Sequence, residues 1–320
     1  MPRSIIRAAA ALALTLLSGA ASAEYPERPI RMVVPYAAGG GADSAARIVG
    51  QQLSTALGQQ VVIDNRAGAG GVIGADNVAK SAPDGYTLLF DASAFATNTA
   101  LRKLPYDARQ DLIPLSLVVI APNIMVVPPK APYRTVTELL DYARKNPGKL
   151  TYASAGAGSA SHLAGEALDD AAKVDIIHVP YRGGAPALND LMGDRVSLYF
   201  GNTASTLGHV TGGSVRALAI GSPKRSRLLP DVPTLEESGL AGFESQEWNG
   251  IFVPKGTPPA IVARLSAEIA KAVNAPDIKA KLEGLGLEPV GNTPEAFGAF
   301  VRSEMERAAA IVKARNIKID

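Results

Sequence analysis

Residues 31–57 read RMVVPYAAGGGADSAARIVGQQLSTAL, which places an apolar run, a glycine loop and an amphipathic segment in direct succession. The run 31–35 predicts a buried strand. Beyond the loop, apolar residues recur at i, i+4 and i+8, which predicts a helix over 43–57 that ends at Gly58. The next strand is predicted to begin at 61–63. Strand, helix and strand in this order form the unit of a parallel sheet covered by helices, so the stretch predicts an α/β fold.

The same alternation continues along the rest of the chain. Further strands are predicted at 86–90, 115–119, 124–127, 150–153, 175–179, 196–200, 217–220 and 250–253. Helix starts are predicted where a capping box or a cap residue before proline occurs, at Thr135–Glu138, Thr234–Glu237, Thr257-Pro258 and Thr293-Pro294. Asn146-Pro147-Gly148 is a helix stop.

The chain length and its proline-rich segments predict two domains. At roughly 150 residues per domain, 320 residues suggest two of them. Prolines cluster at 121–129 and again at 223–233, which separates a central block from its flanks. We therefore expect one lobe of 24–122 with 247–320 and a second lobe of 123–246. Because the chain would cross between them twice, the connection would act as a hinge.

The composition excludes several classes of function. Lys and Arg number 32 against 30 Asp and Glu, without basic clusters, so no footprint for nucleic acid or an anionic membrane is present. With 0 cysteines, disulfides, thiolate chemistry and cysteine-based zinc sites are excluded. The three histidines, His162, His178 and His209, have no short metal-ligand spacing. We expect no metal and no cofactor.

The N-terminus has the pattern of an export signal. Arg3 and Arg7 precede an apolar run over 8–17, and Ala21-Ser22-Ala23 supplies the small residues of a cleavage site. The run is shorter than the ~20 residues that a membrane-spanning helix needs. These features predict a signal peptide over 1–23, cleavage near Ala23 and a periplasmic location.

Three glycine-rich loops, 35–43, 154–161 and 181–186, each precede a predicted helix. A helix N-terminus carries unpaired N–H groups and a partial positive charge, which favour a carboxylate or a phosphate. Glycine lets the backbone approach a ligand, and serine adds hydroxyl donors. Tight turns without a ligand remain the alternative for each single loop, whereas three such loops together favour an anion-binding cleft.

Nucleotide-binding and hydrolase motifs are missing from the sequence. The segment 68–71 resembles a dinucleotide fingerprint, but the motif requires a glycine at the position of Ile73. No Walker A motif, no G-x-S-x-G and no S-x-x-K occurs. The adjacency of Ser161 and His162 does not indicate a catalytic dyad, because nucleophile and base normally come from separate segments. We expect no catalytic residue and no enzymatic activity.

A series of motifs spans the chain after the leader: YPERPI (25–30), VPY (34–36), NRAGAGG (65–71), APDGYTLL (82–89), LPYD (104–107), PGKLTY (147–152), HLAGE (162–166), HVPYRG (178–183) and LPDVPT (229–234). In these motifs and their order the chain resembles the Bug-type extracytoplasmic solute receptors, the substrate-binding proteins of tripartite tricarboxylate transporters. The resemblance implies a type II-like periplasmic-binding-protein fold, with two α/β lobes joined by two crossover strands and a ligand cleft between them. It also implies a small carboxylate ligand and membrane subunits that perform the transport.

The loops and the resemblance together identify the residues expected to bind the ligand: Tyr36, Ala38, Gly39, Gly40, Asp43, Ser93, Ser154, Gly158, Ser159, Ser161, His162, Tyr181, Arg182, Asn202 and Trp248. For Trp248, the sequence alone favours a core position. The loops 35–43 and 154–161 contain no Lys or Arg, so helix N-termini and serine hydroxyls are expected to hold the carboxylate, with Arg182 not the principal anchor.

Three points are left open by the sequence. The segments 91–94 and 201–205 and Asn249 depart from the family pattern, so the ligand is not identified. A sensor partner of a membrane kinase would use the same cleft, and an exported hydrolase or lyase is the enzymatic alternative. The protein is expected to be a monomer that binds no nucleic acid.

Overall fold

The predicted unit at the start of the chain is present in the computed structural model, which describes residues 25–314, 317 and 318. Strand β1 (Ile30–Val34) is followed by the glycine loop, helix α2 (Gly41–Leu57) and strand β2 (Val61–Asn65). The two strands pair in parallel. The helix begins at Gly41, two residues before the expected start, and Gly58 ends it with a φ of +66°. The predicted leader lies outside the described residues.

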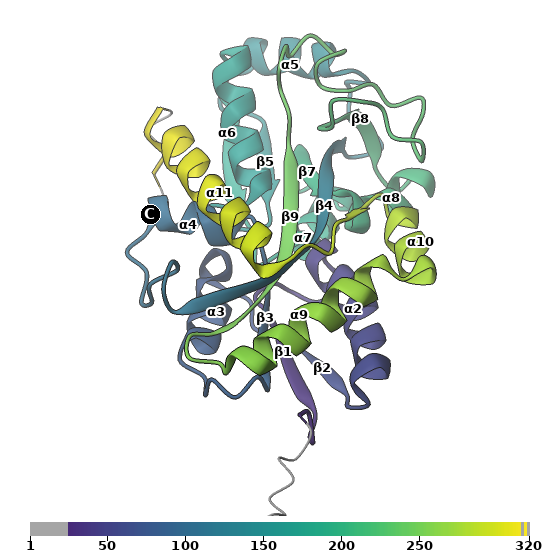
Figure 1. Ribbon diagram of the computed structural model, residues 1–320. Coiled ribbons are helices and arrows are strands. Elements are labelled where there is room, and N and C mark those ends of the chain that lie inside the picture. Colours follow the sequence, from purple (N-terminus) through teal and green to yellow (C-terminus); the bar gives the residue numbers. More distant parts are fainter. Residues whose placement is uncertain (1–24, 315–316, 319–320) are drawn as a thin grey trace, which may run out of the picture.

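The first lobe is built on one half of a 10-stranded sheet, in the order β2, β1, β3 (Thr87–Ala92), β9 (Gln246–Pro254) and β4 (Leu112–Val127). It occupies the lower part of Figure 1. The remaining elements of this lobe are η1 (Ala69–Gly71), α3 (Val72–Ala79), α4 (Ala94–Leu101), α9 (Pro259–Asn274), α10 (Pro276–Gly284), β10 (Glu288–Pro289) and α11 (Pro294–Ala314).

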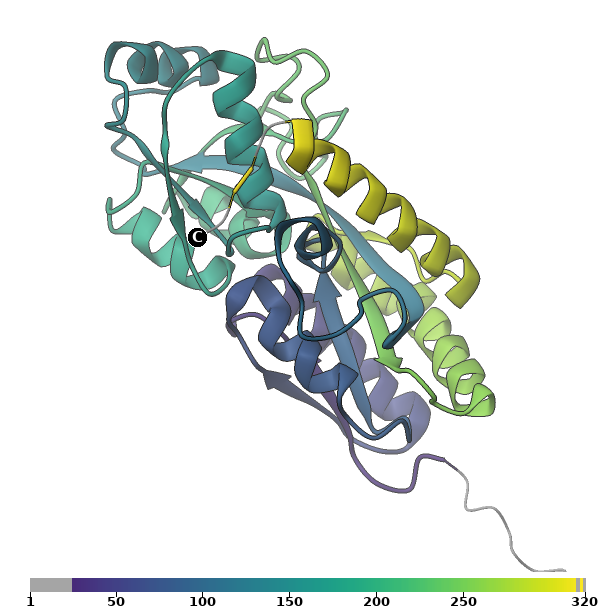
Figure 2. The ribbon, with the colours of Figure 1, turned by 90° about the vertical axis from the view of Figure 1, so that its left-hand side faces the viewer.

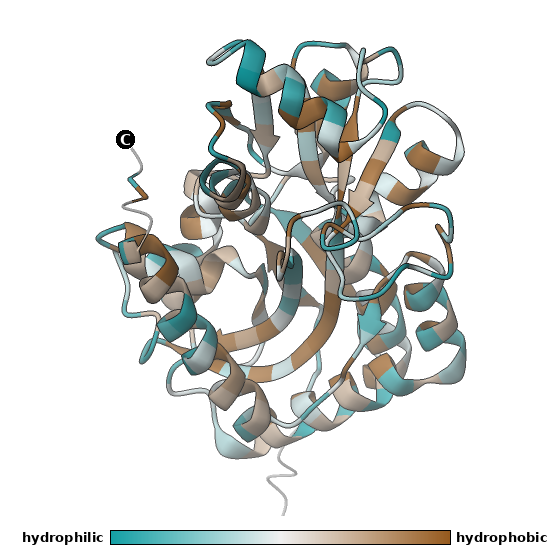
Figure 3. Ribbon diagram, turned by 90° about the horizontal axis from the view of Figure 1, so that it is seen from above, coloured by the Kyte–Doolittle hydropathy of each residue, from teal (hydrophilic) through white to brown (hydrophobic). Residues whose placement is uncertain are grey.

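The second lobe lies above the first in Figure 1 and continues the same sheet through β4, β7 (Leu198–Asn202), β5 (Thr151–Ser154) and β6 (Ile177–Pro180). Strand β8 (Arg216–Ile220) also pairs with β4. The helices of this lobe are α5 (Val136–Lys145), α6 (Ala160–Ala172), α7 (Gly184–Met192) and α8 (Thr203–Thr211). Buried side chains pack on both faces of the sheet in each lobe, and the strands are largely apolar (Figure 3). The class is α/β, as predicted.

Two strands carry the chain between the lobes. Strand β9 pairs with β4 from Leu112↔Pro254 to Pro122↔Gln246, and both pass through the middle of the molecule (Figure 2). The prediction of separate strands at 115–119 and 124–127 was wrong, because β4 is one strand of 16 residues. Pro122 is the last residue of β4 that pairs with β9, and pairing with β7 starts at Asn123, so this proline lies at the ends of two ladders.

Of the four predicted helix starts, two are confirmed, one is shifted by one residue and one is wrong. Thr135 caps α5 by accepting a hydrogen bond from the Glu138 N–H, and α11 begins at Pro294 as predicted. Helix α9 begins one residue later than predicted, at Pro259. The helix predicted at Thr234–Glu237 is wrong, although both hydrogen bonds of the capping box form, because the turn ends at Gly239, which has a φ of +94°.

In the described part of the chain, no helix combines the length and the apolar character needed to cross a bilayer.

Candidate functional site

Five helices begin at one small cavity between the lobes. It is lined by Tyr36, Gly40, Gly41, Ala42, Ala92, Ser93, Ala94, Ala155, Ser159, Ala160, Gly184, Tyr199, Asn202, Ser205 and Glu247. These residues include the N-cap or the first residue of α2, α4, α6, α7 and α8. The convergence arises because each helix follows a strand of the sheet, and these strands end at the interlobe boundary. Each helix start adds partial positive charge to the same cavity.

Several hydrogen-bond donors at the cavity are unsatisfied. The helices α2, α4 and α7 have no side-chain cap, so their first N–H groups lack the partner that a cap supplies. Ser93 Oγ and Asn202 Nδ2 are buried without a hydrogen-bond partner. A buried unpaired donor costs about 1–3 kcal/mol, which an acceptor from a ligand would recover.

The two lobes are in direct contact around the cavity. The Ala37 N–H of the first lobe donates to the Arg182 carbonyl of the second at 3.0 Å. On another side, Arg102 Nη2 donates to the Ala157 carbonyl at 3.1 Å. The enclosed volume is about 20 Å³, room for about one water molecule. The arrangement is therefore closed, and a molecule larger than water would enter only if the lobes part.

The first glycine loop is organised by Asp43. Its carboxylate accepts hydrogen bonds from the Gly39 N–H, from Arg47 Nε and from Asn65 Nδ2, at 2.9, 2.9 and 3.0 Å. Burial of Asp43 opposes ionisation, but these hydrogen bonds leave its pKa below the ordinary value. Asp43 thus holds the loop in shape and does not line the cavity, whereas Ala38 and Gly39 are exposed.

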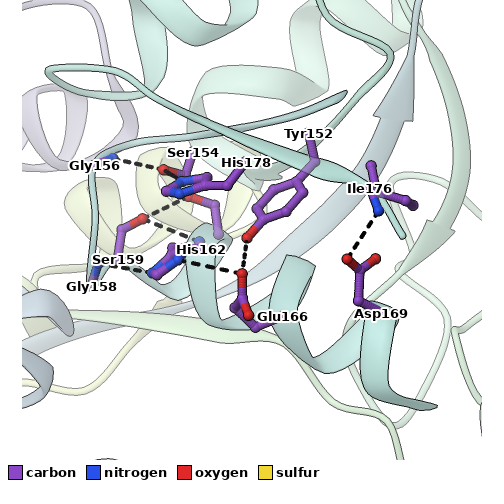
Figure 4. Close-up of polar contacts among 11 residues, drawn as sticks. Tyr152, Ser154, Gly156, Gly158, Ser159, His162, Glu166, Asp169, Ile176 and His178 are labelled. Atoms are coloured by element: carbon purple, nitrogen blue, oxygen red, sulfur yellow. Dashed lines mark hydrogen bonds and ion pairs between the residues drawn. The ribbon is translucent and has the colours of Figure 1, made fainter. Parts of the chain in front are cut away.

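The hydroxyls of the second loop are used within the loop (Figure 4). Ser154 Oγ lies 2.7 Å from His178 Nε2 and accepts a hydrogen bond from the Gly156 N–H. Ser161 Oγ accepts from the Ala155 N–H. Ser159, the N-cap of α6, is the one predicted residue of this loop that lines the cavity. The serines therefore set the loop conformation, and residues of this segment such as Ala155 and Ala160 line the cavity.

Two neutral histidines support the second loop from behind. The rings of His162 and His178 stack with their centroids 4.1 Å apart. His162 Nδ1 accepts a hydrogen bond from the Gly158 N–H, so this ring nitrogen carries no proton. Burial lowers the pKa of His162, and burial together with the neighbouring ring lowers the pKa of His178 to about 3. Protonation of either ring would oppose the packing of this loop.

We predict that the folded protein loses stability through His178 on acidification. An unfolded chain binds a proton at His178 below pH ~6.5, whereas the folded chain does not until about 3. The contribution of His178 is thus complete above pH 6.5 and decreases as the pH falls. Chemical denaturation at pH 7 and pH 5 should show that the wild type loses about 1–2 kcal/mol more than His178→Gln. Equal losses would contradict a neutral His178, since the buried acids are common to both proteins.

Three other predicted residues lie away from the cavity. Tyr181 donates to Asp190, and the side chain of Arg182 is exposed while its carbonyl meets Ala37. Trp248 is 3% exposed, packs against Phe297 and Phe300 of α11, and donates through Nε1 to Glu304. The core position that the sequence alone favours for Trp248 is the one observed.

The cavity lining also includes Tyr199, Ser205 and Glu247, which were not predicted from the sequence. The position of Glu247 could have been predicted from strand geometry. Side chains alternate along a strand, so a core position for Trp248 puts its neighbour Glu247 on the other face of β9. Burial raises the pKa of Glu247 to about 7, although Asn249 and Asn202 partly offset this.

A second acid, Asp91, lies beside the cavity. Tyr36 donates to its Oδ1 at 2.8 Å, and the Ala92 N–H donates to the same atom. Burial raises its pKa to about 7 despite these bonds. Asp91 is thus satisfied within the first lobe and fixes the Tyr36 ring at the cavity wall.

A larger cavity of about 150 Å³ shares Ser93 and Ala160 with the first. Its other walls are the sides of α4, α6 and α11 and the segment 244–246, and its Arg307 is already paired with Glu304. Because it is lined mainly by helix sides, it lacks the convergence of helix N-termini. The smaller cavity is the better candidate for an anion. Within the described ranges, no group of three potential metal ligands occurs.

The family model described as "Tripartite tricarboxylate transporter family receptor" matches residues 45–317. Among curated proteins, one from the tcbD-tcbE intergenic region of Pseudomonas sp. is 43% identical over 94% of this chain and 91% of its own length. Protein BugT of Bordetella pertussis is 38% identical over 92% of this chain and 91% of its own length.

Solved structures agree with this match. The periplasmic binding protein BugD superimposes with a TM-score of 0.89 at 40% identity, over 92% of this chain and 99% of that one. A Rhodopseudomonas palustris protein with adipate gives a TM-score of 0.89 at 34% identity, over 92% and 99%. MatC of the same organism, with bound malate, gives a TM-score of 0.86 at 33% identity, over 90% and 100%.

Proposed function

This chain belongs to the tripartite tricarboxylate transporter receptor family, and from that premise we propose that it captures a small organic carboxylate in the cavity between its lobes. The relatives with adipate and malate support a carboxylate as the ligand class. The convergence of five helix N-termini on one cavity carries the proposal, together with the unpartnered donors Ser93 Oγ and Asn202 Nδ2.

The helix N-termini and hydrogen-bond donors at the cavity can together account for most of a micromolar affinity. A partly buried helix terminus contributes up to about 2 kcal/mol, and a hydrogen bond to a charged group about 1.5–3 kcal/mol. A micromolar affinity requires about 8 kcal/mol in total. A few backbone and side-chain donors therefore account for most of it, which agrees with a cavity whose described lining contains no Lys or Arg.

The proposal also covers where the protein acts, which proteins it works with and where its lobes begin and end. The leader 1–23 would direct the chain to the periplasm and be removed near Ala23, which fits relatives described as periplasmic. The receptor would act as a monomer, with the second lobe formed by 123–246, and deliver its ligand to membrane subunits of the transporter. A sensor role would use the same cavity, and binding to the purified membrane subunits distinguishes transport from signalling.

We predict that ligand closes the lobes. A thermal-shift screen of the mature chain against a carboxylate panel should find ligands that raise the melting temperature, since they bind the folded state only. Small-angle scattering with a saturating hit should then show a smaller radius of gyration than without it. The matching amide, which lacks the charge, is the control. An unchanged scattering curve would contradict the clamp, and consumption of the hit during incubation would indicate an enzyme.

A further inference from the structure

One peptide unit of the second glycine loop is held from both lobes. The Ala157 carbonyl accepts a hydrogen bond from Arg102 Nη2 of the first lobe at 3.1 Å. The Gly158 N–H of the same trans peptide donates to His162 Nδ1 of the second lobe, also at 3.1 Å (Figure 4). Because the C=O and N–H of a planar trans peptide point in opposite directions, the two side chains together fix the orientation of this unit.

This peptide unit directly precedes the part of the loop that reaches the cavity. Ser159, the N-cap of α6, and Ala160, its first residue, both line the cavity. At Gly158 a Cβ would lie 3.1 Å from Asn98 Oδ1 and 3.2 Å from Leu101 Cδ1, so the loop lies close against α4 of the first lobe. A rotation of the peptide unit would therefore change where the N-terminus of α6 lies at the cavity.

Arg102 is oriented for this contact by its own lobe. Its Nε donates to Asn98 Oδ1 at 2.9 Å, and Asn98 Nδ2 donates in turn to the Gly70 carbonyl at 2.9 Å. Asn98 is 1% exposed, so its amide is fixed inside the lobe. A Cβ at Gly70 would lie 2.5 Å from the Ala157 carbonyl oxygen, so this glycine leaves the space in which that oxygen reaches the guanidinium.

The guanidinium of Arg102 is a half-buried cation whose two acceptors, an amide and a peptide carbonyl, are both neutral. Burial lowers the pKa of Arg102, and no acid in the described part of the chain offsets this. A hydrogen bond from an ionised donor is about twice as strong as one between neutral groups. The bond to Ala157 is thus a strong contact that exists only while the two lobes lie together.

We propose that Arg102 is a positioning residue: its bond to the Ala157 carbonyl latches the second glycine loop to the first lobe and sets the N-terminus of α6 at the cavity. Its side chain does not line the cavity, so it acts through the peptide and not by contact with a ligand. The effect on binding rests on the carboxylate-binding function proposed above, whereas the latch is measurable without a ligand.

The first experiment measures the latch in the ligand-free protein. The chain has 0 cysteines, so two spin labels attach only at Lys80→Cys and Lys173→Cys, exposed sites on the first and second lobe. Pulsed electron spin resonance gives the distribution of distances between the labels. Arg102→Met, which removes the donors, should lower the ratio of closed to open molecules about 10-fold, since a charge-assisted hydrogen bond is lost. Lys103→Met, an exposed neighbour with the same loss of charge, should leave the ratio unchanged.

The second experiment measures the consequence for binding. Calorimetric titration should use adipate and malate, the acids present in two related structures. Arg102→Met should bind them more weakly by about the same factor of 10, because affinity falls with the fraction of molecules that can close. Arg102→Lys keeps the charge but not the fork that reaches Asn98 and Ala157 together, and should recover part of the loss. Lys103→Met should bind like the wild type.

The outcomes separate the latch from the receptor function. An unchanged distance distribution in Arg102→Met would overturn the latch, and so would a wild type that shows no closed population with or without the two acids. A lower melting temperature without a change in distances would reduce Arg102 to a structural role. Unchanged affinity for an acid that the wild type binds would overturn the positioning of α6. If no carboxylate binds the folded wild type, the proposed function fails, and the distances alone decide on the latch.

Discussion

Replacing Gly41 with alanine should reduce ligand affinity at least 100-fold, about 2.7 kcal/mol, while both lobes remain folded. Gly41 begins α2 in the first lobe, and Asn202 caps α8 in the second. A Cβ at position 41 would overlap Asn202 Oδ1 and lie 2.5 Å from its Cγ and 3.0 Å from its Cβ. Relief requires either the loss of the α8 cap or a gap between the lobes. The close approach of the two lobes at this contact, which closure over a ligand also requires, would therefore be opposed.

Two control variants isolate this effect. Gly208→Ala adds the same methyl group within α8, where no atom lies within 4 Å of the new Cβ, and should leave affinity unchanged. Arg182→Gln should also bind normally, because the interlobe contact uses the Arg182 carbonyl and not its exposed side chain. Titration calorimetry and thermal unfolding of all three variants check the prediction. Normal binding by Gly41→Ala would show that the lobes do not close as described, and loss of binding in Arg182→Gln would indicate an ion pair as the anchor.

Replacing Asn202 with aspartate should lower carboxylate affinity by about 100-fold or more. The Asn202 Oδ1 accepts the Ala204 N–H at 2.9 Å, and an aspartate oxygen keeps this cap. Its Nδ2, the unpartnered donor at the cavity, becomes an acceptor that carries charge beside Glu247. Two like charges at about 4 Å repel by roughly 4 kcal/mol at an effective dielectric constant of 20, before screening. The helix is retained, and the anion is repelled.

The test of this substitution needs a variant with the same change in net charge. Asn189→Asp lies on the exposed face of α7 and should bind like the wild type. Calorimetry should show a large loss for Asn202→Asp that lessens as the pH falls and the new acid is protonated. A loss that is the same at every pH, or a similar loss in Asn189→Asp, would mean that the charge at the cavity is not the cause.

The amino-acid sequence by itself determined the local structure and the family. The strand at 31–35, its glycine loop and the helix that ends at Gly58 were predictable because apolar periodicity and glycine at positive φ act over a few residues. The caps at Thr135 and Thr293 have the same local origin. The glycine loops also predicted correctly that helices begin directly after the strands. That an anion binds between these helix N-termini stays a prediction.

Which residues share a cavity was decided by the tertiary structure alone. Ser154 and His162 carry polar groups suited to a ligand, but only packing shows that they are already used. His178 contacts the Ser154 hydroxyl, and the N–H groups of Gly156 and Gly158 donate to Ser154 Oγ and His162 Nδ1. The capping box at Thr234 formed its hydrogen bonds without a helix, because the chain there pairs with Ile220 and turns. Strand β4 runs through Pro122, where its partner changes from β9 to β7, which no local pattern encodes.

The clearest case is the pairing of Gly41, Asn202 and Glu247. They lie far apart in the sequence, on α2, at the start of α8 and on crossover strand β9, and each is unremarkable in its own segment. They meet only because the strands of both lobes end at the boundary between the lobes, where the two lobes contact each other. Sequence patterns report interactions within a turn or between neighbouring residues, whereas the sign of charge inside a cavity depends on which distant segments surround it. The helix N-termini that meet at this cavity were therefore predictable from the loops, and its buried acid, Glu247, was not.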